Sequence, residues 1–345
     1  MNIDTLVRKN VKKMSSYFSA RDDFSKENVK KLIYLDANES PFDNRINRYP
    51  DNKHTELKKV VSDIKNVNVN EVIFGNGTDE ILDLIVRVFC DPYRDKIITL
   101  PPTYGMYDVI AKTNGVENIE IPLKSDFSIN KNEILKLSST STKILFLCSP
   151  NNPTGNSFDL NDLIDIIKCF KGVVVVDEAY IDFSSKQSLI SLIEHNNNLI
   201  ITQTLSKAYG MAGIRLGMGF SSKKIIDYLN KIKPPYNINV LTERKALKEL
   251  NKINEIEKNI SIVLEQRKLL VSCLEKLVFV EKIYKSDANF LLVKVDNADL
   301  RYNQLLDKGI VVRNRSNQPL CQNCLRITIG TKNENTSLIK TLNEL

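Results

Sequence analysis

Between residues 55 and 240 the chain alternates short apolar runs with amphipathic stretches. Its apolar runs are EVIF, KIITL, KILFLC, GVVVV, LIIT and RLGMGF, and several are rich in β-branched residues. Short runs of this kind, bounded by turn residues, are typical of strands that are buried on both faces. The stretches between them, such as DLNDLIDIIKCFKG, have the spacing of amphipathic helices. This alternation predicts an α/β fold with a mostly parallel sheet and helices on both of its faces.

The pattern changes after the pair Pro234-Pro235. Residues 241–277 have a helical pattern without Gly or Pro, and the chain continues with the strand-like runs FVEKIYKS, NFLLVKV, GIVVRNR and CLRITIG. These elements are typical of a smaller α+β domain. We therefore predict a large α/β domain at residues 40–236 and a small domain made of residues 1–39 and 237–345.

Composition and charge narrow the class of protein. Of the 345 residues, 42% are hydrophobic and 26% are charged, which is ordinary for a globular protein. No apolar run approaches the roughly 20 residues that cross a bilayer, and the N-terminus lacks the long apolar segment of a secretory signal. The net charge is +7, but the lysines are interleaved with acids, as in KALKELNKINEIEK. We predict a cytoplasmic protein that binds neither nucleic acid nor membrane, while small anionic substrates remain compatible with its charge.

The six cysteines do not form a metal motif. Cys321 and Cys324 make the one CxxC of the chain, and the only histidines are His54 and His195. A zinc site would need two further cysteine or histidine ligands at a suitable spacing. The pattern favours reduced, mostly buried thiols, and we predict no metal site.

Candidate chemistry follows the strands, because ligands of open α/β sheets bind beyond the carboxyl ends of the strands. The segment Gly75-Asn76-Gly77-Thr78-Asp79 follows EVIF and precedes a helical stretch. Glycines let the backbone approach an anion, and a helix N-terminus offers free N–H groups, so this segment suits a phosphate. It is equally compatible with a tight turn in which Thr78 or Asp79 caps the helix.

Three further residues have the character of a cofactor site. Asp177 follows four valines, where a buried carboxylate needs a partner such as a protonated pyridine nitrogen. Lys207 follows LIITQTLS, and desolvation there would lower its pKa and expose a nucleophilic amine. Arg215 comes eight residues later, and its guanidinium can bind a phosphate through two hydrogen bonds. Each residue alone is more often ordinary than catalytic, but together they are typical of a site for a phosphorylated aldehyde cofactor.

These residues lie in motifs that resemble a known family. In chain order the motifs are SYFSARDDF, LDANESPF, NRYPD, GNGTDE, PPTYGMY, CSPNNPTGN, VVDEAYIDF, TLSKAYGMAGIRLG and CLRITIGT. The chain resembles, over nearly its whole length, the fold-type-I aminotransferases of class II that depend on pyridoxal 5′-phosphate (PLP). SPNNPTG, DEAY and SKAYGMAGIRLG in this order are specific for the superfamily, whereas PPTYGMY, NRYPD and RITIGT favour the histidinol-phosphate branch. The resemblance implies a large domain with a mostly parallel sheet of the seven-stranded type.

The resemblance also implies a cofactor site. Lys207 would hold PLP as a Schiff base and then move the proton between the substrate Cα and the cofactor C4′. Asp177 would pair with the pyridinium nitrogen, Asn152 and Tyr180 would hydrogen-bond the phenolate oxygen, and Tyr104 would stack on the ring. The catalytic residues would be Lys207, Asp177 and Tyr180. The residues expected around the cofactor phosphate are Thr78, Asp79, Thr204, Ser206 and Arg215, with Tyr49 from the neighbouring subunit of a homodimer.

Substrate contacts follow from the same resemblance. Arg326 would hold the carboxylate of glutamate in one half-reaction and lie near the substrate phosphate in the other. Arg313 and Tyr17 would be further phosphate contacts, and Asn38 would line the pocket. Arg315 lies two residues from Arg313 on the same strand face, so it competes with Arg313 for this role.

The favoured function is amino-group transfer between L-histidinol phosphate and 2-oxoglutarate, giving imidazole-acetol phosphate and glutamate, in histidine biosynthesis. An aromatic or broad-specificity aminotransferase would use the same cofactor site without a substrate phosphate. A PLP lyase such as a threonine-phosphate decarboxylase would bind a phosphorylated substrate but break the bond to its carboxylate. A non-enzymatic effector-binding module would need a DNA-binding domain, for which the N-terminal segment is too short.

Overall fold

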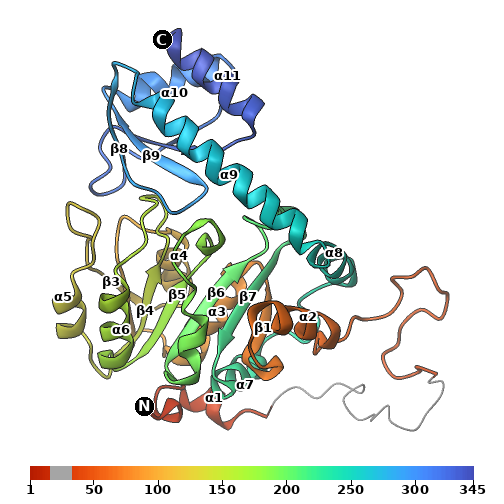
Figure 1. The fold of residues 1–345 in the computed structure, drawn as a ribbon. Helices are drawn as coiled ribbons and strands as arrows, with labels where there is room; N and C mark the ends of the chain where they lie inside the picture. Colours follow the sequence, from red (N-terminus) through yellow and green to blue (C-terminus); the bar gives the residue numbers. More distant parts are fainter. Residues whose placement is uncertain (16–32) are drawn as a thin grey trace.

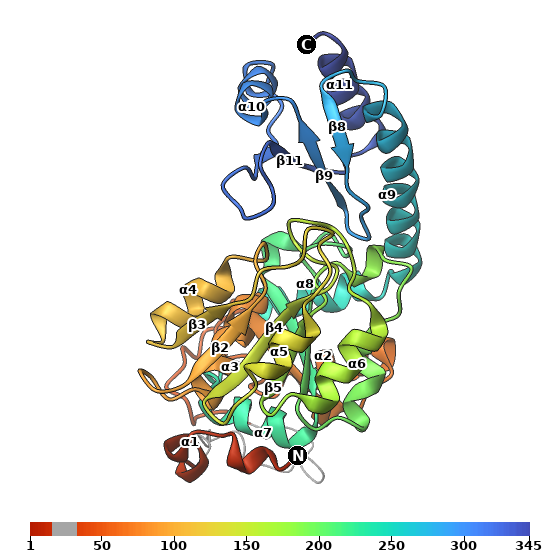
Figure 2. The same cartoon turned by 90° about the vertical axis from the view of Figure 1, so that its left-hand side faces the viewer.

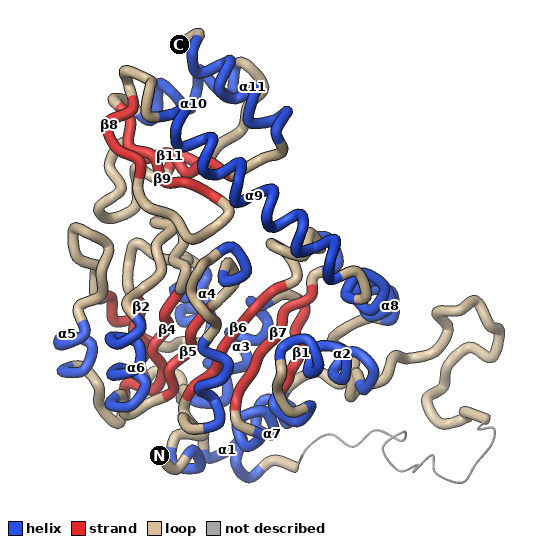
Figure 3. The backbone as a smooth tube through the Cα atoms, in the orientation of Figure 1, coloured by secondary structure: helices blue, strands red, loops and turns tan. Residues whose placement is uncertain are grey.

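A seven-stranded sheet organises the large unit of the computed structural model, which describes residues 1–15 and 33–345. Its strands follow the order β1-β7-β6-β5-β4-β2-β3 (Figure 1, Figure 3). The strands are β1 Val72–Asn76, β2 Lys96–Thr99, β3 Glu117–Glu120, β4 Thr142–Cys148, β5 Val173–Asp177, β6 Leu199–Thr204 and β7 Leu216–Ser221. Five neighbouring strands, β3, β2, β4, β5 and β6, run parallel to one another. Strand β7 is antiparallel to both β6 and β1. The predicted α/β fold with a mostly parallel sheet of seven strands is therefore confirmed.

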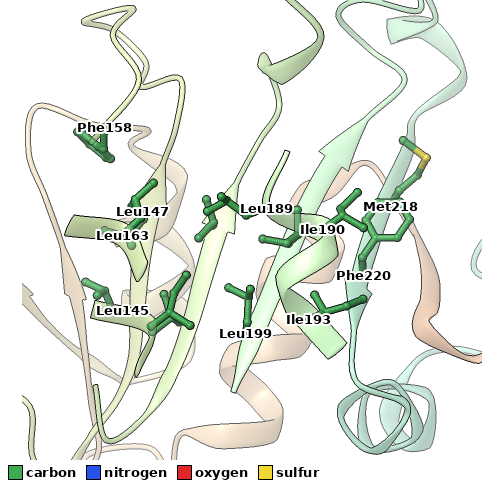
Figure 4. Packing of buried hydrophobic residues seen from close by; sticks show 14 of the residues in the cluster. Leu145, Leu147, Phe158, Leu163, Leu189, Ile190, Ile193, Leu199, Met218 and Phe220 are labelled. Carbon is green, nitrogen blue, oxygen red and sulfur yellow. The ribbon is translucent and has the colours of Figure 1, made fainter. Parts of the chain in front are cut away.

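Helices cover both faces of this sheet, because its central strands are apolar on both sides (Figure 2). Leu145 and Val174 belong to the core on one face, and their neighbours Phe146 and Val175 belong to the core on the other. The first face is covered by α2 Thr55–Lys65, α5 Lys131–Lys136, α6 Leu160–Cys169 and the 3-10 helix η6 Leu189–Glu194. The second face is covered by α3 Thr78–Phe89, α4 Met106–Thr113 and α7 Lys223–Ile232. Figure 4 shows part of the first face, where β4 packs against α6 beside η6. Each large aliphatic side chain buried in this way contributes about 1.5–3 kcal/mol relative to exposure.

A four-stranded antiparallel sheet forms the small unit, in the order β10-β11-β9-β8. Its strands are β8 Val280–Ile283, β9 Phe290–Val295, β10 Arg313–Asn314 and β11 Cys324–Thr328, and its helices are α9 Ile253–Leu274, α10 Ala298–Asp307 and α11 Lys332–Asn343. The helices cover one face, where Leu291 and Val293 of β9 pack with Leu270 and Leu274 of α9. Leu292 between them belongs to the core of the large unit. The second face of this sheet is therefore turned toward the large sheet.

Helices α8 (Val240–Leu250) and α9 connect the two units (Figure 1). The helical pattern at residues 241–277 is interrupted at Asn251 and Lys252, because asparagine is a weak helix former and Lys252 leaves the helical backbone region. A backbone hydrogen bond of 2.7 Å from Asp287 N to Gly155 O also joins the units. The predicted domain boundary near residue 236 precedes α8 and stays a prediction.

Neither α9, which has 22 residues, nor any other helix in the described ranges combines the length and apolarity needed to cross a membrane.

The first residues pack on the large unit. They form the 3-10 helix η1 (Ile3–Thr5) and helix α1 (Lys9–Lys13). Ile3 of η1, Val11 of α1 and Val7 between the two helices are buried in the core shared with α3 and α7. Asp4 accepts a hydrogen bond of 2.6 Å from Lys224 Nζ on α7. The predicted placement of residues 1–39 in the small domain does not hold for this stretch. The spacing of apolar residues identifies a face that must be buried, but it does not identify the surface that buries it.

Residues 33–49 lie on the outside of the large unit. Figure 1 shows this segment leading away from the body of the molecule before it returns at α2. Ile33, Leu35 and Phe42 are 81%, 89% and 80% exposed. Exposed apolar side chains gathered in one segment are typical of a surface that meets another chain.

Candidate active site

A cavity of about 150 Å³ lies where β5 and β6 end, beside the N-terminus of α3. Its lining consists of Thr78, Asp79, Tyr104, Cys148, Asn152, Asp177, Ala179, Tyr180, Thr204, Ser206, Lys207, Ala212 and Arg215. Every residue predicted to bind the cofactor within one subunit is among them, because the parallel strands all end at the same edge of the sheet. A larger cavity of about 350 Å³ lies on the opposite face, between α6 and η6, and its lining is mainly apolar. Size alone therefore does not identify the site, whereas the chemistry of the lining does.

One end of the smaller cavity is built for an anion. Helix α3 begins after Gly77, whose φ of +76° favours glycine and which has no side chain to cap the first N–H groups of the helix. The guanidinium of Arg215 lies against Gly77, where a Cβ atom would collide with Nη2. Gly77 N donates a hydrogen bond of 2.8 Å to Arg215 O, and Ser206 N donates one of 3.0 Å to Thr204 Oγ1. An uncapped helix N-terminus, a guanidinium and two hydroxyl groups together suit a phosphate.

Asp177 lies at the end of β5, with 4% of its surface exposed. Its carboxylate accepts hydrogen bonds from Tyr107 Oη at 2.8 Å, from Thr202 Oγ1 at 3.2 Å and from Ala179 N at 3.3 Å. Burial raises the pKa of Asp177 to about 6, although the three hydrogen bonds oppose this rise. All three donors are neutral, so a cationic group of a ligand would stabilise the ionised carboxylate. A protonated pyridine nitrogen supplies such a group.

Lys207 follows β6 and lines the same cavity. Burial lowers its pKa, and the positive charges of Arg326 and Arg215 lower it further. Its Nζ lies 5.7 Å from the centre of the Tyr180 ring. Because a lower pKa favours the neutral amine, Lys207 is suited to attack an aldehyde and to accept a proton.

An aromatic wall closes another side of the cavity. Tyr104 Oη donates a hydrogen bond of 3.1 Å to Asp79 Oδ1. The Tyr104 ring meets the edge of the Tyr107 ring at 5.5 Å between centres, and Tyr107 in turn stacks on Phe146 at 4.8 Å. These contacts fix the ring of Tyr104 in a position to cover a flat ligand.

Two residues that hold Asp177 were not predicted from the sequence. They are Tyr107, which is fully buried, and Thr202, which lies within β6. A signal for each exists in the sequence. Tyr107 follows Tyr104 by three residues in PPTYGMY, and Thr202 precedes Thr204 by two residues, which places both threonines on one face of the strand.

The small sheet brings arginines to this cavity. Arg326 of β11 donates a hydrogen bond of 2.6 Å from Nη1 to Asn152 Oδ1, and its guanidinium lies 5.4 Å from the centre of the Phe290 ring. Arg313 of β10 faces Arg326 directly across the strand pair. Burial lowers the pKa of Arg315, and the charges of Arg326 and Arg313 lower it further. The structure thus brings the predicted substrate residues Arg326 and Arg313 together, with Arg315 beside them.

Two predicted residues are not at the cavity in the single chain, and the position of a third is not described. Tyr49, which was predicted to serve the neighbouring subunit, is 50% exposed and stacks on Tyr236 with ring centres 4.5 Å apart. Asn38 is exposed in the segment outside the large unit. Tyr17 lies outside the described residues. The roles of these three residues stay predictions.

The family model for class I and II aminotransferases matches residues 25–342 of the chain. The chain belongs to this aminotransferase family. It is 55% identical to the histidinol-phosphate aminotransferase of Flavobacterium psychrophilum, over 100% of this chain and 99% of the relative. It is 54% identical to the protein of the same name from Christiangramia forsetii, over 100% and 98%. The predicted family is therefore confirmed.

Solved structures have the same fold as this aminotransferase. The histidinol-phosphate aminotransferase from Clostridium acetobutylicum is 27% identical, with a TM-score of 0.80 over 87% of this chain and 92% of that chain. The L-threonine-O-3-phosphate decarboxylase from Porphyromonas gingivalis is 20% identical, with a TM-score of 0.73 over 87% and 90%, and its likeness concerns the fold alone. Transaminases and decarboxylases share this fold, so the reaction must be argued from the site.

Proposed function

We propose that this aminotransferase moves an amino group between L-histidinol phosphate and 2-oxoglutarate, giving imidazole-acetol phosphate and glutamate, in histidine biosynthesis. The observation that carries the proposal is the pair Arg313 and Arg326 beside the cavity of Lys207, in a chain 55% identical over its full length to an enzyme named for this reaction. Two neighbouring guanidinium groups suit a substrate that carries a phosphate.

The residues of the cavity fit PLP. The N-terminus of α3 and Arg215 would hold its phosphate, and Asp177 would pair with its ring nitrogen. Tyr104 would cover one face of the ring, and Asn152 and Tyr180 would hydrogen-bond its phenolate oxygen. When bound, PLP supplies an electron sink that stabilises negative charge at the substrate Cα.

Lys207 is the residue that would move the proton. Between turnovers it would hold the cofactor covalently, and during each half-reaction its free amine would carry a proton between the substrate Cα and the cofactor C4′. The lowered pKa of Lys207 favours the neutral amine that accepts this proton. Asp177, fixed by Tyr107 and Thr202, would keep the ring nitrogen protonated through its negative charge.

Arg326 would serve both substrates, because they enter the same pocket in turn. Glutamate brings a carboxylate on Cα, and histidinol phosphate brings a phosphate ester on the corresponding side. A guanidinium can bind either anion through two parallel hydrogen bonds. The 2.6 Å hydrogen bond to Asn152 fixes the orientation of Arg326 next to the cofactor ring. Arg313, Tyr17 and Asn38 are the further substrate contacts that we propose.

We also propose that the enzyme is a cytoplasmic homodimer in which Tyr49 of one subunit reaches the cofactor phosphate of the other. The exposed segment at residues 33–49 supports this proposal, because Leu35 and Phe42 are 89% and 80% exposed. A second copy that covered these side chains would remove apolar surface from water. Sedimentation of the purified protein tests the proposal: the mass of two chains supports it, and the mass of one chain rejects it.

A single-turnover absorbance experiment tests the proposed reaction. PLP-loaded enzyme is mixed, without any keto acid, with L-histidinol phosphate, glutamate, phenylalanine or threonine phosphate. Loss of the visible absorbance of the bound cofactor with histidinol phosphate and with glutamate supports the proposal. Conversion with phenylalanine but not with histidinol phosphate would replace it by a broad-specificity aminotransferase. Release of carbon dioxide from threonine phosphate would replace it by a lyase.

A further inference from the structure

Three arginines share the face of the small sheet that is turned toward the cavity. Arg313 and Arg326 are direct cross-strand partners in β10 and β11. Arg315 continues the same ladder, because Arg315 N donates a hydrogen bond of 2.8 Å to Cys324 O. Side chains two residues apart in an extended strand point to the same face, so Arg315 lies on the side of Arg313 and Arg326.

Arg315 is placed among positive charges and is left with an unused donor. Its Nε is buried and has no hydrogen-bond partner among the described residues. In the same parts of the chain, no carboxylate forms an ion pair with Arg313, Arg315 or Arg326. Neighbouring like charges destabilise one another, and a buried donor without a partner adds a further cost. An anion that entered this group of arginines would offset both costs.

Backbone hydrogen bonds within residues 315–324 hold the loop that carries Arg315 in one conformation. Gln318 N donates to Arg315 O at 2.9 Å, Cys321 N to Gln318 O at 3.1 Å and Cys324 N to Cys321 O at 3.0 Å. The bond from Arg315 N to Cys324 O completes the ring at 2.8 Å. Cys321 and Cys324, which take part in these hydrogen bonds, are buried. The backbone of Arg315 is therefore ordered before a ligand arrives, which lowers the entropic cost of binding.

Arg315 and Arg326 differ in their contacts with the cofactor cavity. Arg326 contacts Asn152, which lines the cofactor cavity. Arg315 makes no such hydrogen bond within the described residues, but its charge lies close enough to Tyr180 for the two groups to influence each other's pKa. The α-carboxylate of an amino acid is bonded directly to Cα, whereas the phosphate of an amino-alcohol phosphate is separated from Cα by a methylene group and an ester oxygen. A phosphate therefore extends farther from the reacting atom, and it has one more free oxygen to bind.

We infer that Arg315 binds the phosphate of the phosphorylated amine substrate and so determines the preference of the enzyme for it. Arg326 binds the carboxylate in one half-reaction and part of the phosphate in the other, and Arg315 supplies the additional donors that only a phosphate reaches. This inference rests on the proposed function, because it assigns a residue to one of the two proposed substrates. It makes Arg315 a partner of Arg313, whereas the sequence presented the two residues as alternatives.

The experiment compares three variants of the PLP-loaded enzyme in the two half-reactions. Arg315→Gln removes the charge, Arg315→Lys keeps the charge without the planar fork, and Arg94→Gln removes an exposed arginine of the large unit whose side chain is 67% exposed. A hydrogen bond to a charged group corresponds to roughly 10- to 100-fold in affinity, so Arg315→Gln should raise the KM for L-histidinol phosphate by about that factor. Its saturating rate and its KM for glutamate should change by less than about threefold. Arg315→Lys should recover part of the loss, and Arg94→Gln should match the wild type.

Inorganic phosphate provides a readout that does not depend on the proposed reaction. It should inhibit the glutamate half-reaction competitively, and Arg315→Gln should weaken this inhibition by about the same factor of 10 to 100. An unchanged KM for histidinol phosphate with unchanged phosphate inhibition in Arg315→Gln would overturn the inference while the proposed function stands. An equal loss for glutamate and histidinol phosphate would also overturn it. A wild-type enzyme that does not convert histidinol phosphate, but binds inorganic phosphate in a manner that depends on Arg315, would reject the proposed function and retain the phosphate site.

Discussion

The cofactor end and the substrate end of the active site differ in how their charges are balanced. At the cofactor end, Asp177 has three hydrogen-bond donors of its own, and Arg215 is tied to the loop before α3. At the substrate end, Arg313, Arg315 and Arg326 share one face without an ion pair in the described parts of the chain. The cofactor stays bound, so the protein can hold Asp177 and Arg215, the charges that would meet it, in place with fixed hydrogen bonds. A pocket that exchanges one anionic substrate for another must keep its positive charge free between them.

The largest effect is expected at the cofactor end. Lys207→Ala should lower turnover by more than about 10⁴-fold, because the substitution removes both the covalent hold on the cofactor and the group that moves the proton. The measurement is kcat with histidinol phosphate and 2-oxoglutarate, together with the visible absorbance of the bound cofactor. Lys171→Ala, at an exposed lysine of the large unit, is the matched control. Turnover near the wild-type level would assign the proton transfer to another residue.

Asp177→Asn tests whether the negative charge of Asp177 is needed, because asparagine has nearly the same shape without the charge. Tyr107 and Thr202 donate to different oxygens of Asp177. Asparagine keeps the size of the side chain and one of these two acceptors, but it removes the negative charge opposite the ring nitrogen. Turnover should fall by about 10²- to 10³-fold, a magnitude typical of losing a preorganised electrostatic contact at a reacting group. The cofactor content of the purified variant, measured after denaturation, should stay close to that of the wild type. An unchanged kcat would contradict the role of Asp177, and a protein without cofactor would show that Asp177 is needed for binding rather than for chemistry.

Arg326→Ala tests the residue of the substrate end that contacts the cofactor cavity through Asn152. The substitution removes a cation that each substrate anion uses in turn, and it releases Asn152 from its 2.6 Å hydrogen bond. The rate constants of both half-reactions at low substrate concentration should therefore fall by about 10- to 100-fold. Single-turnover absorbance with glutamate and with histidinol phosphate separates the two effects. A loss with glutamate alone would show that the phosphate is held elsewhere, at Arg313 and Arg315.

The cofactor end was largely predictable from the sequence, and the substrate end was predictable only in part. Asp177 and Lys207 each follow an apolar run, and parallel strands end at one edge, so the sequence alone indicates that these two residues meet. The substrate end depends on how a second sheet lies against the first. The sequence places Arg313 and Arg315 on one strand face. It does not indicate that Arg315 Nε is buried or that backbone hydrogen bonds close the loop that carries it.

Tertiary packing also decided two features within the large unit. The hydrogen bond from Tyr107 to Asp177 joins residues 70 positions apart. It exists because Tyr107 of α4 stacks on Phe146 of β4, the strand that pairs with β5. Residues 3–13 have the apolar spacing of a buried helix, but the surface that buries them, formed by α3 and α7, is far away in the sequence. The spacing of apolar residues indicates that a segment has a face to bury, but it does not indicate which part of the protein will cover that face.

The smallest expected effect concerns this unpredicted residue, Tyr107. Tyr107→Phe removes one of the donors that oppose the rise of the Asp177 pKa to about 6. A neutral hydrogen bond contributes about 1 kcal/mol, which corresponds to roughly 0.7 pH units, so the pKa of Asp177 should rise by about that amount. Since the ionised form of Asp177 is the active one, a higher pKa means that activity is lost at a higher pH on acidification. The acid limb of the kcat/KM profile should therefore move upward, and the ratio of wild-type to variant activity should grow as the pH falls from 8 to 5. If the variant instead loses activity by one constant factor across this range, Tyr107 supports the cavity only as a packing element, and the charge balance at the cofactor end does not depend on it.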